Sequence, residues 1–311
     1  MRVLLTGANG FLGSHTTRYL LKNGHTVMAV SRSCDSFTDI LDRIQFVSYN
    51  SLNVETLQLF SPDVVIHFAW EGGNNYKDVN SVNQFDNIKS GVCLLDILCN
   101  LDKKPMFIGV GSFSEYGILT EKALETQTDC PITLYGLSKS TFKDVSSRLC
   151  QQFGMRWAWV RPCYVYGPND VKTRLIPRVV ESLLKKEPVQ LDSCNVTIDY
   201  LYIDDFCRGV SMIAETQHTG VFNVCSGQEY VLRDVLNEIQ THIGSGGIAF
   251  DTTIHRNLLS TYVCGNNENL KSLGWSPTVP LERGLVEVIH SIKMELFLKT
   301  NPVDHDGLHC E

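Results

Sequence analysis

Two patterns of apolar residues alternate along the first half of the chain. Short unbroken apolar runs are typical of strands buried on both faces of a parallel sheet, whereas apolar residues three or four apart indicate helices. The predicted strands are residues 3–5, 26–30, 44–48, 62–69, 106–110 and 157–161. The predicted helices are residues 11–23, 79–100 and 134–153. Strands that alternate with helices in this way predict an α/β fold with a doubly wound parallel sheet.

Beyond Arg161 and Pro162 the pattern is less regular, and short helices mix with short strands. The predicted elements are a helix near 177–186, strands at 197–203 and 220–224, and helices near 232–243 and 281–297. We therefore expect the chain to cross between two lobes. The predicted divisions are a first domain of residues 1–165 with returning segments near 197–224, a smaller C-terminal lobe of residues 166–196 and 225–300, and a loose tail of residues 301–311.

Composition and charge narrow the class of protein. Of 311 residues, 43% are apolar and 20% are charged, as in ordinary globular proteins, and the net charge of −7 argues against non-specific nucleic-acid binding. Eleven scattered cysteines without a CxxC pair fit reduced thiols better than disulfides or a metal site. Because no apolar run approaches a bilayer span and no leader pattern opens the chain, we expect a cytoplasmic protein without a membrane partner.

The turn between the first strand and the first helix is the earliest candidate for chemistry. Gly7, Gly10 and Gly13 would let the backbone turn sharply, let a pyrophosphate approach the main chain and let the helix lie close to the strand. The N–H groups and the dipole at a helix N-terminus favour phosphate there. The sequence thus predicts a dinucleotide site formed by Gly7, Asn9, Gly10, Phe11, Leu12 and Gly13.

The residues after the second strand favour a 2′-phosphorylated dinucleotide. An acidic residue here would bind the ribose 2′-hydroxyl of NAD, whereas Ser31 and Arg32 offer a hydroxyl and a charged fork for a 2′-phosphate. We therefore expect NADP(H) as the preferred cofactor, with NAD(H) possible, and a solvated loop arginine remains the alternative. Asn50 is expected to face the adenine, and His67, inside a buried strand, is expected to be a hydrogen-bonded core residue.

Tyr135 and Lys139 lie four residues apart and therefore on one face of the predicted helix 134–153. A nearby ammonium lowers the pKa of a phenol, so the pair suits acid–base chemistry at a carbonyl. Such a pair is common by chance. Here it follows the glycine turn and the hydroxyl-bearing stretch 112–117, which strengthens the interpretation.

Taken together these motifs resemble the extended short-chain dehydrogenase/reductase family, the group of nucleotide-sugar epimerases, dehydratases and reductases. The matching stretches are residues 6–13, 67–69, 112–117, 135–139, 161–168 and 199–204. The resemblance implies a Rossmann domain that binds NAD(P), a C-terminal lobe that binds the nucleotide sugar, and a homodimer formed through the two long helices.

The resemblance also implies roles for individual residues. Ser112 and Tyr135 would hydrogen-bond the reacting substrate oxygen, with Tyr135 as the proton donor or base. Lys139 would tune Tyr135 and hold the nicotinamide ribose. Ala69 and Asn87 would border the cofactor.

Departures from the family pattern narrow the reaction. Dehydratases of the group carry two carboxylates after the catalytic hydroxyl, where this chain has Phe113 and Ser114. The epimerase–reductases that make GDP-fucose use a Cys and a His for proton exchange, and Ser114 and Asn169 stand at those places. Hydride transfer alone therefore remains.

The expected substrate lobe departs from the pattern too. Tyr164 replaces a common asparagine, and Ile198 replaces an arginine that usually binds the diphosphate. Another cation must then neutralise the diphosphate. Arg256 is the first candidate, followed by Arg174 and Arg178, while Ser114, Tyr164 and Asn169 are expected to line the sugar site.

The leading hypothesis is an NADPH-dependent reductase of a nucleotide-linked 4-keto-6-deoxy sugar. The alternative is an NAD-dependent nucleotide-sugar 4-epimerase that uses the same Ser112, Tyr135 and Lys139. A non-catalytic protein that senses the cofactor is the alternative from another class, and the complete Tyr135/Lys139 pair argues against it. The nucleotide, the sugar and the stereochemistry stay open.

Overall fold

A seven-stranded sheet forms the centre of the larger part of the protein in the computed structural model, which describes residues 1–72, 79–253 and 261–301. The strands are β1 (Arg2–Thr6), β2 (Thr26–Ser31), β3 (Gln45–Ser48), β4 (Val64–His67), β5 (Met106–Val110), β6 (Trp157–Pro162) and β11 (Gly220–Val224). Their order is β11-β6-β5-β4-β1-β2-β3, and every neighbouring pair is parallel. The predicted doubly wound α/β Rossmann fold is confirmed.

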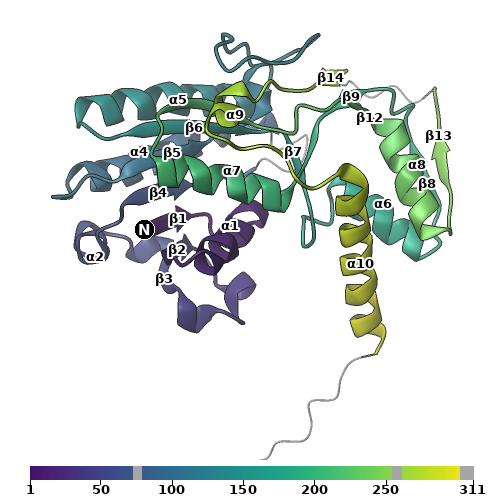
Figure 1. Ribbon diagram of the computed structural model, residues 1–311, viewed down its shortest axis with the longest axis horizontal. Coiled ribbons are helices and arrows are strands. Elements are labelled where there is room, and N and C mark those ends of the chain that lie inside the picture. Colours follow the sequence, from purple (N-terminus) through teal and green to yellow (C-terminus); the bar gives the residue numbers. More distant parts are fainter. Residues whose placement is uncertain (73–78, 254–260, 302–311) are drawn as a thin grey trace, which may run out of the picture. The chain divides into compact units, whose positions relative to one another are not determined.

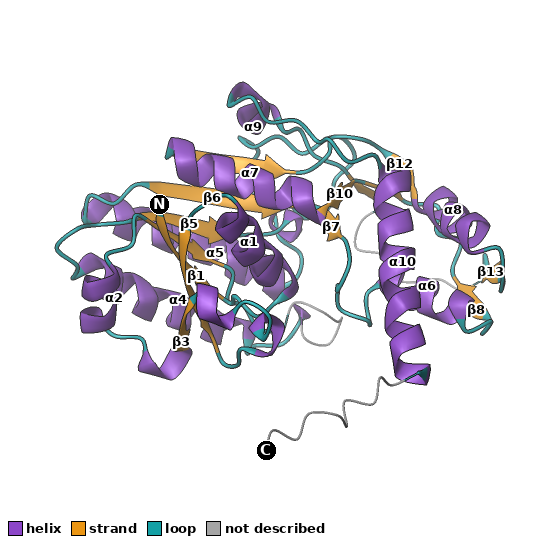
Figure 2. Ribbon diagram, turned by 60° about the horizontal axis from the view of Figure 1, so that its bottom comes forward, coloured by secondary structure: helices purple, strands orange, loops and turns teal. Residues whose placement is uncertain are grey.

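Helices cover both faces of this sheet. They are α1 (Phe11–Lys22), α2 (Val54–Phe60), α4 (Gln84–Cys99), α5 (Leu134–Gln152) and α7 (Ile203–Thr216). Figures 1 and 2 show α1 and α7 packed together on one face, and α4 packed on α5 on the other. Because both faces are covered, the central strands are almost wholly apolar, which explains why unbroken apolar runs predicted them.

The order of the strands reverses between β1 and β4. From β1 the chain builds outward through β2 and β3, then returns to β4 on the other side of β1 and continues to β5 and β6. In open parallel sheets the carboxyl ends of the strands diverge at such a point and leave a crevice for a ligand. The glycine turn after β1 lies at this point.

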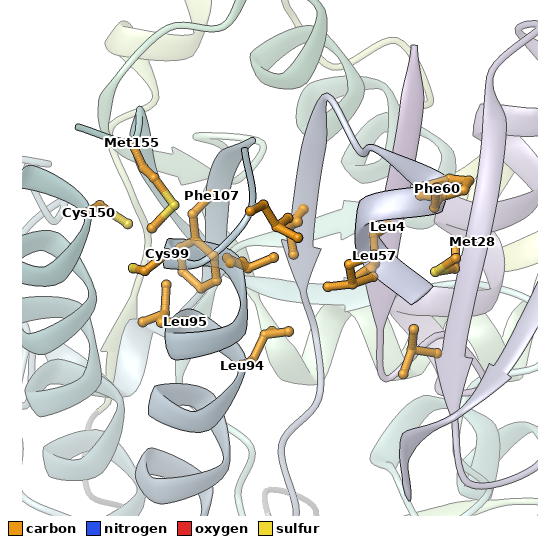
Figure 3. Close-up of a cluster of buried hydrophobic side chains, with 14 of the residues drawn as sticks. Leu4, Met28, Leu57, Phe60, Leu94, Leu95, Cys99, Phe107, Cys150 and Met155 are labelled. Carbon is orange, nitrogen blue, oxygen red and sulfur yellow. The ribbon is translucent and has the colours of Figure 1, made fainter. Parts of the chain in front are cut away.

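The core beneath the crevice is built from strand and helix side chains. Leu4, Met28 and Phe107 of the sheet pack against residues of α2, α4 and α5 and are fully buried. Figure 3 shows Leu94, Leu95 and Cys99 of α4 beside Phe107, and Leu57 with Phe60 of α2 beside Leu4 and Met28. Close packing of this kind fixes the strand ends that carry the candidate site.

Short elements complete the larger part. The strands are β7 (Tyr164–Tyr166), β9 (Thr197–Ile198), β10 (Tyr200–Tyr202), β12 (Tyr230–Val231) and β14 (Tyr262–Val263). The helices are η1 (Asp35–Phe37), η2 (Leu41–Arg43), η3 (Tyr49–Ser51), η4 (Phe113–Glu115) and α9 (Glu268–Ser272). The predicted strand 197–203 is therefore wrong as a single element. It is divided at Asp199, whose carboxylate accepts hydrogen bonds from the N–H groups of Ser226 and Gly227, and the helix α7 already begins at Ile203.

The chain divides into two compact units. The larger comprises residues 1–165, 196–230 and 257–279, and the smaller comprises 166–195, 231–256 and 280–311. The described residues of 257–279, expected in the smaller lobe, group with the larger unit. The side chain of Asn223 donates to the carbonyl of Asn266 over 2.9 Å, and buried Trp275 donates to the carbonyl of Asp205 over 3.1 Å.

The smaller unit is mainly helical. Its helices α6 (Leu175–Leu184), α8 (Leu232–Ile243) and α10 (Leu281–Thr300) pack on one another, beside the strand pair β8 (Val189–Leu191) and β13 (Ile248–Phe250). The hydroxyl of buried Tyr166 donates to the carbonyl of Leu281 over 3.0 Å. Within the described ranges, none of the helices combines the length and the apolar character that crossing a bilayer requires.

Candidate active site

The glycine turn after β1 is held by close backbone contacts. Gly7 has a φ of +66°, and a Cβ there would lie 2.6 Å from the amide nitrogen of Ala69. A Cβ on Gly13 would lie 2.4 Å from the carbonyl oxygen of Gly7. No side chain caps α1 at Gly10, so the first amides of that helix are not bound by a capping side chain. This turn suits a diphosphate, because backbone N–H groups at a helix N-terminus bind phosphate and glycines let it approach the main chain.

The side chain of Asn9 joins the glycine turn to the loop after β2. Its Nδ2 donates to Ser33 Oγ over 2.9 Å, and its Oδ1 accepts from the amide of Ser36 over 2.8 Å. Ser31 donates its hydroxyl to the carbonyl of Ser33. Asn9 and Ser31 therefore hold the loop after β2 in place through hydrogen bonds that involve no ligand.

Arg32 lies in this loop with 82% of its side chain exposed, and it pairs with Glu71, which is 70% exposed and follows β4. The strand β1 lies between β2 and β4, so the two charged residues flank the glycine turn. Sequence reasoning missed Glu71, whose carboxylate pairs with the Arg32 guanidinium. Asn50 is exposed in η3, just after β3.

The loop after β4 is braced against α4. Asn87, which is buried, accepts from the amide of Glu71 over 2.8 Å and donates to the carbonyl of Glu71 over 3.1 Å. The amide of Ala69 donates to Thr6 Oγ1 over 3.4 Å. Asn87 thus fixes the backbone at Glu71, the partner of Arg32, and Ala69 is held beside Thr6 at the end of β1.

His67 is the hydrogen-bonded core residue that its sequence position predicts. Its Nδ1 lies 2.7 Å from Thr6 Oγ1, and its ring contacts those of Phe107 and Phe142. Burial lowers the pKa of His67 to about 3, with the nearby Lys139 cation acting in the same direction. The imidazole is therefore neutral at physiological pH.

Two segments bring the predicted catalytic residues together. Tyr135 lies in the first turn of α5, which Thr133 caps by accepting from the amide of Gly136. A Cβ on Gly136 would lie 2.3 Å from the carbonyl oxygen of Ser114, so α5 begins in close contact with η4. Ser112 caps η4 by accepting from the amide of Ser114 over 3.1 Å. The hydroxyl-bearing segment therefore lies against the first turn of the Tyr135/Lys139 helix.

Lys139 is buried one helical turn after Tyr135. Its Nζ donates to the carbonyl of Val110 over 2.6 Å and lies 5.9 Å from the centre of the Tyr135 ring. Burial lowers the pKa of Lys139 to about 7, and the charge of Glu115 opposes that shift.

A buried ionic network supports Ser112, and sequence reasoning missed it. Glu115 accepts from Arg161 Nε over 2.7 Å, from the Trp159 indole and from the amide of Ser112 over 2.7 Å. Arg161 also pairs with Asp129, and both Glu115 and Arg161 are at most 1% exposed. Burial raises the pKa of Glu115 against the opposing charge of Arg161. The Glu115 carboxylate is thus occupied by hydrogen bonds that hold the segment at Ser112 in place.

Of the expected residues of the substrate site, Tyr164 belongs to the larger unit, and Asn169, Arg174 and Arg178 belong to the smaller unit. Tyr164 on β7 is half exposed and packs edge-on against the ring of Tyr200, with centroids 6.0 Å apart. In the smaller unit Asn169 has a φ of +60°, Arg174 pairs with Asp170 over 3.2 Å, and Arg178 is exposed on α6. Arg256 lies outside the described residues.

One group of described residues has ligand atoms close enough for a metal ion. Glu238, His242 and Glu282 of the smaller unit lie within 4.8 Å of one another. Contacts of His242 Nε2 with the two carboxylates, at 3.8 and 3.9 Å, account for this proximity without an ion.

Known proteins are similar to this chain over most of its length. The model of a family described as "NAD dependent epimerase/dehydratase family" matches residues 3–225. CDP-abequose synthase from Salmonella typhimurium is 25% identical over 299 residues, which cover 92% of this chain and 97% of that protein. The dTDP-6-deoxy-L-talose 4-dehydrogenase (NAD(+)) from Aggregatibacter actinomycetemcomitans is 23% identical over 249 residues, 76% of this chain and 89% of that protein.

Solved structures show the same fold. UDP-glucuronic acid 4-epimerase from Bacillus cereus, in complex with UDP-glucuronic acid and NAD, superposes with a TM-score of 0.83 at 25% identity, covering 95% of this chain and 100% of that one. UDP-glucose 4-epimerase from Thermotoga maritima superposes with a TM-score of 0.82 at 22% identity, with the same coverage of both chains.

Proposed function

Since the chain belongs to the NAD-dependent epimerase/dehydratase family, we propose that it is an NADPH-dependent reductase of a nucleotide-diphosphate-linked 4-keto-6-deoxy sugar. The observation that supports this proposal most is the absence of an accessible carboxylate in η4, the segment in contact with the start of α5. Its only carboxylate, Glu115, is fully buried and bound to Arg161 and to the amide of Ser112. Water elimination needs a carboxylate that reaches the substrate, and none is offered by this segment.

The residues divide the remaining chemistry among themselves. Ser112 donates a hydrogen bond to the ketone oxygen and orients it toward Tyr135. The Tyr135 hydroxyl gives its proton to that oxygen as negative charge develops there. The Lys139 ammonium stabilises the phenolate that remains, because opposite charges favour each other's ionised form. NADPH, when bound, supplies the hydride for the ketone carbon.

The cofactor half of the proposal rests on two features of the crevice. The glycine cradle at Gly7, Gly10 and Gly13 accepts a diphosphate on backbone N–H groups. Arg32 then reaches a 2′-phosphate in place of Glu71, because phosphate carries more charge than a carboxylate and binds a guanidinium bidentately. NAD(H) is the alternative cofactor, and the NAD complex among the similar structures favours it.

Replacing Arg32 with alanine should lower the affinity for NADP+ by about ten- to a hundred-fold, because the charged hydrogen bonds to the 2′-phosphate are lost. The affinity for NAD+ should stay nearly unchanged, because NAD+ has no 2′-phosphate. Glu71→Gln should raise NADP+ affinity by about two- to five-fold, since the competing exposed carboxylate is neutralised. Titration calorimetry with both dinucleotides measures these changes, and Arg43→Ala, an exposed arginine of η2, is the matched control. If the unaltered protein binds NAD+ at least as tightly as NADP+, the preference is wrong.

The second candidate is a nucleotide-sugar 4-epimerase. The similar structures of 4-epimerases favour it, and the same Ser112, Tyr135 and Lys139 would take part in the oxidation and re-reduction of a sugar carbinol. Similarity to CDP-abequose synthase and to the talose 4-dehydrogenase favours the reductase. NAD that copurifies with the protein, together with turnover without added dinucleotide, would identify the epimerase.

The substrate diphosphate needs a cation from the smaller unit. Arg174 already pairs with Asp170, whereas Arg178 has no ion pair within the described residues. Arg178 is therefore the better candidate of the two, and Arg256 stays a prediction. Tyr164, Asn169 and Ser114 are proposed to contact the sugar. Loss of nucleotide-sugar affinity in Arg178→Ala would support this assignment.

We further propose a homodimer through α4 and α5, because Phe85 of α4, Leu137 of α5 and Val82, which precedes α4, are exposed apolar residues. Light scattering of the diluted protein tests this, and a monomer at micromolar concentration contradicts it. A cytoplasmic location stays a prediction from the scattered thiols.

A panel of nucleoside diphosphates, screened by thermal melting with NADP+ and NAD+ alongside, tests the substrate class. A ligand that binds the native state raises the melting temperature in proportion to the logarithm of its saturation. We expect one nucleotide to shift melting clearly more than the others. The matching 4-keto-6-deoxy sugar nucleotide should then oxidise NADPH stoichiometrically, and absence of NADPH oxidation across the CDP, dTDP, GDP and UDP sugars contradicts the proposal.

A further inference from the structure

A tryptophan next to the Tyr135/Lys139 pair has no part in the proposal above. Trp70 follows β4, and the Nζ of Lys139 lies over its ring, 3.8 Å from the centroid. The same ring meets that of Tyr135 edge-on, with centroids 6.5 Å apart and an interplanar angle of 85°. One side chain therefore contacts both members of the pair.

The orientation of Trp70 is fixed from two helices. Its indole Nε1 donates to Oε1 of Gln84 on α4 over 2.8 Å, and Gln84, only 2% exposed, also donates to the carbonyl of Gly72 over 2.6 Å. Its ring leans on Phe142, one turn beyond Lys139 on α5, with centroids 6.1 Å apart. The indole face is thus held against the ammonium by contacts that do not involve a ligand.

The indole face of Trp70 gives the buried Lys139 ammonium a favourable electrostatic contact. Among the residues that the structure describes, the Lys139 ammonium has one hydrogen-bond acceptor, the carbonyl of Val110. A cation over an aromatic face is attracted by the ring quadrupole, most strongly for tryptophan and most strongly where water is excluded. We propose that Trp70 is a positioning residue, which keeps the Lys139 ammonium charged and in place beside Tyr135. This inference rests on the proposed function in taking Lys139 as the group that tunes Tyr135.

Other groups around Lys139 also affect the equilibrium between its charged and neutral forms. Glu115, from η4, favours the charged amine, whereas burial favours the neutral amine and lowers its pKa to about 7. His67, from β4, is neutral, and Tyr135 lies on the same helix as Lys139. An amine that titrates near neutrality changes its charge state in response to a small loss of stabilisation.

Trp70→Met keeps an apolar side chain and removes the aromatic face, whereas Trp70→Phe keeps a weaker face. We expect the pKa of Lys139 to fall by about 0.5 to 1.5 units in Trp70→Met, and by less in Trp70→Phe. The readout in the cofactor-free protein is the NMR signal of ε-13C-labelled lysine across pH, assigned by its loss in Lys139→Met. In the pH profile of kcat/KM, the alkaline limb should shift to lower pH by the same amount. The activity of the variant should therefore recover when the pH is lowered.

The control is Trp157→Phe, because Trp157 stacks on Trp159 and donates to Ser146, away from Lys139. It should lower thermal stability without moving the lysine titration. Gln84→Met removes the anchor of the indole and should lower the Lys139 pKa in the same direction as Trp70→Met. This variant serves as the second test if Trp70→Met fails to fold.

An unchanged lysine titration in folded Trp70→Met and Gln84→Met overturns the inference. So does a loss of activity in Trp70→Met that is the same at every pH, which would indicate a structural role alone. The titration needs no substrate, so it separates a failure of this inference from a failure of the proposed reductase activity. Failure of the latter would leave the titration shift intact.

Discussion

Tyr135→Phe should lower kcat by about a hundred- to ten-thousand-fold, the range that a positioned general acid contributes. The ring would remain packed edge-on against Trp70, because the substitution removes only the hydroxyl. We therefore expect native stability and nearly unchanged NADPH affinity. Single-turnover measurement of NADPH oxidation with the sugar nucleotide identified by melting measures the chemical step itself.

The matched control for this substitution is Tyr19→Phe. Tyr19 is half-buried on α1, outside the Tyr135/Lys139 helix, and it should retain full turnover. Undiminished turnover in folded Tyr135→Phe would contradict the proposed proton transfer. Turnover lost equally in both variants would point to a general effect of losing a hydroxyl.

Arg161→Met should destabilise the protein by about 3–5 kcal/mol, because it leaves the buried carboxylate of Glu115 without its cation. Asp129 keeps Lys143 as a partner, so the loss centres on Glu115. Urea unfolding measures the change as a lower midpoint. Lys103→Met, which breaks the exposed pair with Asp63, is the control and should cost less than about 1 kcal/mol.

A double variant separates the stability of this network from its effect on the site. Glu115→Leu with Arg161→Met removes both buried charges, so most of the lost stability should return. The amide of Ser112 would lose the acceptor that it has in Glu115, so kcat of the double variant should be lower than that of the unaltered protein. An unchanged kcat in the double variant would show that Glu115 does not position Ser112.

The fold was predictable because its central strands are buried on both faces. Runs such as Val3–Leu5 and residues 106–110 have no polar position to interrupt them, so they indicate a covered parallel sheet without knowledge of any contact. The resemblance to the extended short-chain dehydrogenase/reductase family is confirmed, since its motifs are short, local and ordered along the chain. The roles of Ser112, Tyr135 and Lys139 stay predictions, although the contact of Gly136 with Ser114 brings their segments together.

The features that the sequence did not predict depend on contacts between residues far apart in the chain. Glu115 and Arg161 are 46 positions apart, and nothing local in either sequence shows that they form a pair. Trp70 extends an apolar run, where an aromatic residue indicates core as readily as a site. The described residues of 257–279 fall within the predicted smaller lobe of residues 225–300, because no local pattern shows that they return to the larger unit. They group with the larger one through contacts made by Asn223 and Trp275.

The strand β11 has a consequence for how the protein can be made. It pairs with β6 along its length, yet it is encoded 58 residues after the end of β6, at residues 220–224. A nascent chain that has released only residues 1–165 therefore carries Trp157–Pro162 as an unpaired edge strand, the form in which strands pair with other chains and aggregate. The nucleotide-binding part is accordingly a poor candidate for expression as an N-terminal fragment. A chaperone that shields β6 until residue 224 emerges would raise the yield of the full chain.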